Sequence, residues 1–97
     1  MLPEEFHILV SLADGERHGY GILQEIAERT GRKMIMGPGA LYGSIKCLIE
    51  AGLVEEAGEH GDGERRRYYR LTRAGRAAAV AEAEQMLAPG ISIERVV

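Results

Sequence analysis

The fold is decided by residues 53–72, which read LVEEAGEHGDGERRRYYRLT. Residues 53–57 have the pattern of a short strand, and the three glycines within residues 58–63 predict the tip of a hairpin. Residues 64–71 then form the return strand, in which alternate side chains face opposite sides of the sheet. A single hairpin of this kind must pack its apolar face against helices supplied by the rest of the chain.

The side chains of the two strands have distinct expected roles. Tyr69 shares a face with Leu71, so we expect Tyr69 in the core. Glu55 and Glu56 lie across the hairpin from the arginines of the return strand, so part of the arginine run is expected to pair with its neighbour strand. Because adjacent strand residues point to opposite faces, these two carboxylates cannot act together on one substrate.

Helices are predicted both before and after the hairpin in the sequence. The first begins near Pro3 and stops at Asp14-Gly15, and its apolar face consists of Phe6, Leu9, Val10 and Ala13. The second runs from about Gly19 to Thr30, and its buried stripe consists of Ile22, Leu23, Ile26 and Ala27. The third begins near Pro38, buries Leu41, Ile45 and Leu48, and turns a slim face outward that includes Gly43, Lys46 and Cys47. Thr72 is the expected N-cap of a last helix from Arg73 to about Leu87.

This order of elements is that of a winged helix-turn-helix: mainly α, with a β-hairpin wing and a C-terminal dimerisation helix. Its third helix is shaped to enter the major groove of DNA, which admits one α-helix. We expect residues 1–71 to form the DNA-binding domain, and residues 72–97 to form the dimerisation helix with a short tail, the whole being one compact unit. The same fold also serves as a scaffold for protein contacts, so the fold alone does not settle the function.

Length and composition exclude several classes of protein. The 97 residues make one small domain, and 45% hydrophobic with 28% charged residues is typical of a folded chain. The apolar runs are far shorter than the ~18 residues of a membrane span. Acidic Glu4 and Glu5 stand where a signal peptide needs basic residues, and the lone Cys47 fits a reducing compartment. We therefore expect a cytoplasmic protein that makes no membrane contact.

Charge is distributed unevenly along the chain. The formal net charge is −3, yet residues 29–76 carry ten basic and six acidic side chains. Half of all Lys and Arg residues belong to one stretch: Arg65, Arg66, Arg67, Arg70, Arg73 and Arg76. A basic centre in an acidic chain suits nucleic acid. No nucleophile motif, phosphate-binding loop or metal-ligand spacing is present, so we expect no enzyme, no catalytic residue, no metal and no cofactor. His18 is expected to have a structural role, either capping the second helix or bonding near it.

Four motifs closely resemble the PadR-type family of bacterial transcriptional regulators: HGYGI at 18–22, GALY at 39–42, LIEAGLV at 48–54 and RYYRLTRAG at 67–75. The resemblance covers roughly residues 3–88. It implies a homodimeric repressor of the short subtype, which binds a double-stranded DNA operator. Regulators of this kind often release DNA when a small molecule binds, commonly a phenolic or drug-like compound, and we expect such an effector at the dimer interface.

The resemblance also assigns roles to residues. The DNA contacts that it implies come from the third helix and the wing: Gly39, Tyr42, Ser44, Lys46, Arg65, Arg66 and Arg67. Tyr42 and Lys46 are expected to reach base edges and nearby phosphates, and the arginines to neutralise phosphates. Tyr20 is expected to pack. Dimerisation is expected through the last helix and the first: Leu9, Val80, Ala83, Met86 and Leu87.

The chain departs from the family pattern at three positions of the third helix. Cys47 stands where a second basic residue is usual, Gly43 where Pro is common, and Ile49 where an acid is usual. The first departure removes a cation from the expected reading face, and Ile49 is expected to add packing. The acidic flank of the wing and the pI near 5.6 favour an alternative, a winged-helix protein-interaction module that binds no DNA itself.

Overall fold

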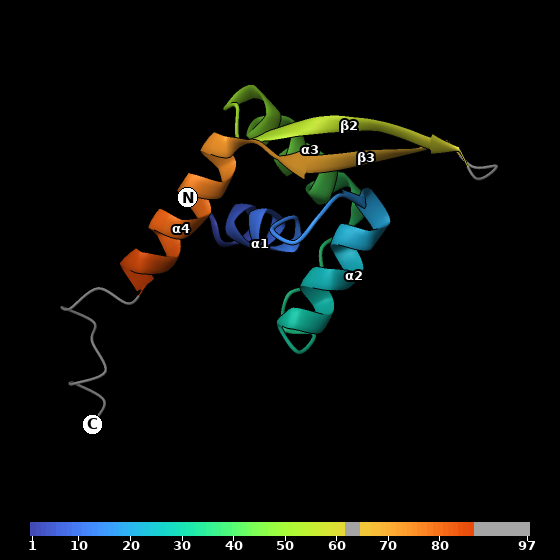
Figure 1. The fold of residues 1–97 in the computed structure, drawn as a ribbon. Helices are drawn as coiled ribbons and strands as arrows, with labels where there is room; N and C mark the ends of the chain where they lie inside the picture. The colour runs from blue at the N-terminus through green and yellow to red at the C-terminus, as the bar shows by residue number, and fades with distance from the viewer. Residues whose placement is uncertain (62–64, 87–97) are drawn as a thin grey trace.

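The computed structural model describes residues 1–61 and 65–86, with the side chains of residues 59–61 and 65 left out. Its elements follow in the order α1 (Pro3–Ser11), β1 (Arg17–His18), α2 (Gly19–Arg29), α3 (Pro38–Glu50), β2 (Val54–Gly61), β3 (Arg65–Leu71) and α4 (Arg73–Met86). The hairpin of β2 and β3 extends to one side of the helices, and α4 lies at the opposite end (Figure 1). This is the predicted winged helix-turn-helix, mainly α with a β-hairpin wing.

The sheet contains a strand that was not predicted. The strand order is β1-β3-β2, and both pairings are antiparallel. The short strand β1 pairs Arg17 with Tyr69, and the side chain of Arg17 also bonds to the carbonyl oxygen of Ser11 over 2.6 Å. Strand β2 is longer than expected and continues to Gly61, with a register shift between Glu56 and Gly58. The hairpin therefore reaches further from the body than the glycines at 58 and 61 suggested.

The core lies between the sheet and the three helices α1, α2 and α3. Its fully or almost fully buried side chains are Ile8, Leu9, Leu12, Ile22, Ile26, Leu41, Ile45, Leu48, Val54 and Tyr69. The prediction that Tyr69 is a core residue is confirmed, with 4% of its surface exposed. The predicted stripe of α1 was wrong in part, because the helix ends at Ser11 and leaves Ala13 exposed, while Ile8 and Leu12 are buried instead.

The burial of Leu9 corrects one residue of the expected dimer interface. Its side chain is 0% exposed within the single chain, where it packs in the core. A second copy therefore cannot reach it. On α4, by contrast, Val80 is 53% and Met86 50% exposed. Leu87, expected to join them, lies outside the described residues.

Thr72 holds α4 against the hairpin, and its prediction as the N-cap is confirmed. Its hydroxyl oxygen accepts from the Gly75 amide over 2.9 Å, and the hydroxyl donates to the Gly52 carbonyl oxygen over 2.7 Å. Its own amide donates to the Leu53 carbonyl oxygen over 3.1 Å. Gly75 is buried at this junction. These bonds set the angle at which α4 leaves the wing.

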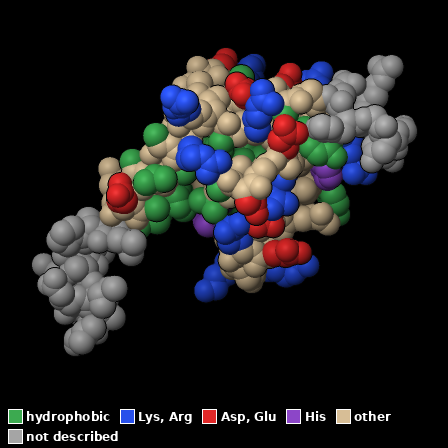
Figure 2. Space-filling model, in the orientation of Figure 1, with side chains coloured by type: hydrophobic (Ala, Val, Ile, Leu, Met, Phe, Trp, Pro, Cys, Tyr) green, Lys and Arg blue, Asp and Glu red, His purple; other side chains and the backbone are tan. Residues whose placement is uncertain are grey.

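Apolar side chains gather on the face of the molecule over α4 and the start of α1 (Figure 2). The exposed apolar side chains include Met1 and Leu2 at the start of the chain, and Val80 and Met86 on α4. None of the helices in the described part of the chain is long and apolar enough to cross a membrane.

Candidate nucleic-acid interface

One face of α3 is slim and exposed. Gly39 lies in the first turn, and Gly43, Lys46 and Cys47 are exposed further along. A β-carbon added to Gly43 would meet no atom of the described residues within 4 Å, so none of them covers the face at this position. Ser44 is half-buried and stands at its edge. Of the predicted helix residues, Gly39 and Lys46 therefore lie open to a partner, and Ser44 only in part.

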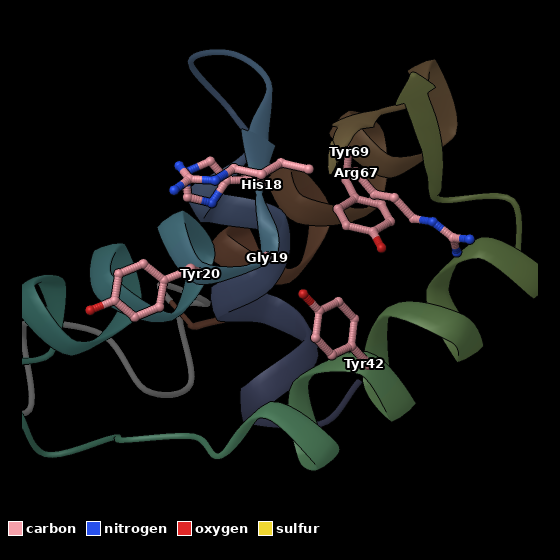
Figure 3. A pocket seen from close by; sticks show the side chains of 7 residues that line it. His18, Gly19, Tyr20, Tyr42, Arg67 and Tyr69 are labelled. Atoms are coloured by element: carbon pink, nitrogen blue, oxygen red, sulfur yellow. The ribbon is translucent and has the colours of Figure 1, made fainter. Parts of the chain in front are cut away.

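A hollow of about 490 Å³ lies between the start of α2, α3 and β3 (Figure 3). It is lined by His18, Gly19, Tyr20, Tyr42, Arg66, Arg67 and Tyr69. We call it the α2–wing hollow. Among the described residues, its lining combines two arginines, one histidine and three tyrosines with a glycine, and none of these is acidic. Segments far apart in the sequence thus form one basic, hydroxyl-rich concavity.

Tyr42 projects into this hollow from α3. Its side chain is 48% exposed, and its hydroxyl points back toward Gly19 (Figure 3). The hydroxyl of Tyr69 points into the same space from β3. Burial raises the pKa of Tyr69, and the nearby Tyr42 and Glu56 raise it further, while Arg67 opposes them. Tyr42 therefore lies beside the exposed face of α3, with its polar end directed at α2.

His18 joins α2 to the wing. Its Nδ1 accepts from the Gly21 amide over 3.0 Å, which confirms the predicted capping of the second helix. Its Nε2 lies 3.2 Å from a guanidinium nitrogen of Arg66. The imidazole also makes an edge-on contact with the ring of Tyr68, with 5.4 Å between the ring centroids. One side chain thus contacts both the helix start and the wing strand.

The arginines of β3 have different surroundings. Arg70 bonds to Glu55 over 2.6 Å and lies 3.6 Å from Glu16, and the bond to Glu55 raises its pKa. Arg67 lies 3.6 Å from Glu56, so the prediction that part of the arginine run pairs with the neighbouring strand is confirmed. Arg66 is exposed and contacts His18. The backbone of Arg65 lies in β3, but its side chain is outside the described residues. Arg66 is therefore the described wing arginine most directly placed at the hollow.

A second hollow, of about 340 Å³, continues along α3 and shares Tyr42, Arg67 and Tyr69 with the first. Its other lining residues are Ile45, Lys46, Ile49, Glu50 and Glu56. We call it the α3–wing hollow. It differs from the first in electrostatics, because two carboxylates stand opposite its two cations. The groove along α3 is thus basic at the α2 end and mixed in charge at the other.

Two residues near this groove differ from expectation. Tyr20 was expected to pack, but it is 63% exposed, and its ring points along α2 away from Tyr42 (Figure 3). Ile49 was expected to pack and is also exposed, at the rim of the α3–wing hollow. His18 was expected to cap the second helix or to bond near it; its contact with Arg66 was not predicted, because it depends on the unpredicted strand β1. Among the described residues, no three His, Cys, Asp or Glu side chains are grouped as metal ligands would be.

Comparison with known proteins identifies relatives of the chain. Residues 8–81 match the family model described as the transcriptional regulator PadR-like family. Transcriptional regulator Rv3488 of Mycobacterium tuberculosis is 42% identical over 72 residues, which cover 74% of this chain and 64% of that protein. The chain spans between about a fifth and two thirds of the length of the curated relatives that it matches.

Solved structures share the fold. H. salinarum RosR is 30% identical, with a TM-score of 0.73 over 90% of this chain and 74% of that one. Bacillus subtilis PadR in complex with operator DNA has a TM-score of 0.72 over 81% of this chain and 45% of that chain. The latter is 22% identical, so its likeness shows the fold alone.

Proposed function

The chain belongs to the PadR-like family of transcriptional regulators, and from this we propose that it binds double-stranded DNA and regulates transcription. The observation that carries the proposal is the groove on one side of the molecule, where the slim exposed face of α3 lies beside the basic α2–wing hollow. A major groove accepts one helix, and basic side chains beside that helix meet the phosphates that flank the groove.

Within this interface we assign contacts to the residues expected from the sequence. Gly39 and Lys46 lie on the exposed part of α3, where Lys46 can donate to guanine or to phosphate. Ser44 contributes at the edge, and Tyr42 at the flank of the helix. Arg65, Arg66 and Arg67 contact the DNA backbone from the wing, and Arg67 must first exchange its pairing with Glu56 for a phosphate.

We further propose that the protein acts as a homodimer, with residues 1–71 for DNA and residues 72–97 for dimerisation. Val80 and Met86 are half-exposed apolar side chains on α4, and small alanines between them, Ala83 among them, allow another helix to approach closely. A twofold dimer would place its two α3 helices on half-sites about one helical turn, ~34 Å, apart. Such a regulator meets its DNA in the cytoplasm.

The regulatory output that we propose is repression relieved by a small-molecule effector at the dimer interface. α4 follows directly from the wing through Thr72, so a molecule wedged beside α4 would change the spacing of the two α3 helices. Coupling of about 1–3 kcal/mol between the two sites would suffice. A reporter gene behind the bound DNA distinguishes repression from activation.

Fluorescence anisotropy tests the proposed function. The labelled DNA is the region upstream of the protein's own gene, and a random duplex of equal length serves as the control, each at two salt concentrations. We expect tighter binding to the upstream DNA, and weaker binding to both at high salt because released counterions oppose binding. Absence of binding to either DNA at low salt would leave the protein-interaction module as the better description.

A further inference from the structure

We propose that the α2–wing hollow is a binding site for one phosphate oxyanion, which a DNA backbone phosphate fills in the complex. Assigning the phosphate to DNA rests on the proposed function; the chemistry of the hollow stands apart from it. The proposed site differs from an ordinary basic wing, because it requires His18 and two tyrosine hydroxyls together with Arg66. It also makes a phosphate, rather than a base, the partner of Tyr42.

The charge of the lining selects an anion. Arg66 contributes positive charge, whereas the charge of Arg67 is offset by Glu56 at 3.6 Å, and none of the seven described lining residues is acidic. Gly19, the first residue of α2, forms part of the wall, so the positive end of that helix dipole adds to the same field. In the adjoining α3–wing hollow, Glu50 and Glu56 offset the charges of Lys46 and Arg67, so that hollow favours an anion less.

The contact between His18 and Arg66 supports the same conclusion. Because Nδ1 of His18 accepts from the Gly21 amide, it carries no proton, and the single proton of the neutral imidazole must be on Nε2. A guanidinium only donates. Two donors therefore face each other across 3.2 Å, and they cannot bond to one another while the cap persists. An oxyanion at this position would accept from both.

The tyrosine hydroxyls complete the set of donors. Those of Tyr42 and Tyr69 point into the hollow from α3 and β3 (Figure 3). Burial raises the pKa of Tyr69, so its hydroxyl keeps its proton at neutral pH and can donate. The ring of Tyr20, by contrast, points along α2 and away from this space. Four side chains from three elements thus line one hollow with donors, a set that suits the several oxygens of a phosphate.

Three single substitutions test the site. Tyr42→Phe removes one donor and no other atom. His18→Asp keeps the cap of α2, because aspartate is among the best N-cap residues, but it sets a carboxylate in the hollow. Tyr20→Phe is the matched control, since it removes a hydroxyl from the same rim that points elsewhere. Thermal unfolding of each variant shows whether the fold is kept.

DNA affinity is then measured by anisotropy on the upstream and random duplexes. We expect Tyr42→Phe to weaken binding about tenfold on both, as for one lost bond to a charged group. His18→Asp should weaken both more strongly, and Tyr20→Phe should match the wild type. The site is refuted if Tyr42→Phe weakens binding to the upstream DNA alone, which would make Tyr42 a base reader, or if neither variant differs from the Tyr20→Phe control.

A titration with inorganic phosphate separates this site from the proposed function. Amide NMR signals of Gly19 and Tyr20 are followed at constant ionic strength, with chloride as the balancing anion. If the wild type binds no DNA, the proposed function fails, while saturable shifts that His18→Asp abolishes would keep the hollow as a site for free phosphate. Absence of both DNA binding and saturable shifts would overturn the site as well.

Discussion

Replacing Gly19 with alanine is expected to weaken DNA binding while leaving the protein folded. Gly19 is the first residue of α2, and the hydroxyl of Tyr42 lies too close to leave room for a β-carbon there. An added methyl group would overlap that hydroxyl and would lie 2.8 Å from Cζ of the same ring. The Tyr42 side chain must therefore swing away from α2 and take its hydroxyl out of the α2–wing hollow.

The structure indicates that this movement costs little stability. Tyr42 is half-exposed, and the overlapping atoms are at the far end of a flexible side chain, so it can rotate into solvent. Alanine also favours helix over glycine by up to about 1 kcal/mol. We expect the free energy of unfolding to stay within about 1 kcal/mol of the wild type, and the affinity for DNA to fall about tenfold, as for Tyr42→Phe.

Gly75→Ala supplies the contrasting case. There the added β-carbon would overlap the carbonyl oxygen of Leu53, which accepts from the Thr72 amide, and would lie 3.2 Å from Cδ2 of Leu71. Backbone cannot rotate away, so overpacking should destabilise the protein by about 1–3 kcal/mol. Urea unfolding and anisotropy on both duplexes measure the two variants side by side.

The outcome for Gly19→Ala is decisive in two ways. Wild-type DNA affinity would show that the position of the Tyr42 hydroxyl does not matter for binding. A loss of stability as large as that of Gly75→Ala would show that Tyr42 is fixed by packing rather than free to move. Either result would refute the reasoning from the contact between Gly19 and Tyr42.

Four further predictions follow from other contacts. Arg66→Ala should weaken binding to upstream and random DNA alike and flatten the plot of log K against log salt by about two units in a dimer, one per wing; an unchanged slope would contradict this. Thr72→Ala should lower the free energy of unfolding by about 1 kcal/mol through loss of the α4 cap, measured by urea unfolding. Because burial raises the pKa of Tyr69 in the folded protein, its contribution to stability is complete below about pH 10, the ordinary tyrosine value, and is lost as the pH rises toward its folded pKa. Urea unfolding from pH 8 to 11 should therefore show a loss of stability that is smaller in Tyr69→Phe. Val80→Glu should convert a dimer to a monomer in sedimentation velocity at micromolar concentration; a wild-type protein that is already monomeric would count against the proposed interface.

Local chemistry in the sequence determined much of the fold. Pro38 begins α3, Thr72 caps α4, and the alternation of β3 buries Tyr69 while it leaves Arg66 exposed. Each of these outcomes depends on neighbours within a few residues, so the spacing of apolar residues and the rules of helix capping predict them. An ion pair between the two strands was also predictable, because a hairpin sets which residues lie across from each other, as Glu55 and Arg70 do.

Other features depended on segments that meet only after folding. Strand β1 has two residues, too few to show a period, and it exists because β3, some fifty residues later, supplies its partner. The exposure of Tyr20 follows from how α2 packs against its neighbours, which helical spacing leaves undetermined. The α2–wing hollow likewise forms only on folding. The sequence contains its arginines, tyrosines and histidine, but their spacing along the chain does not tell which way each side chain points in space. Only tertiary packing places them around one hollow.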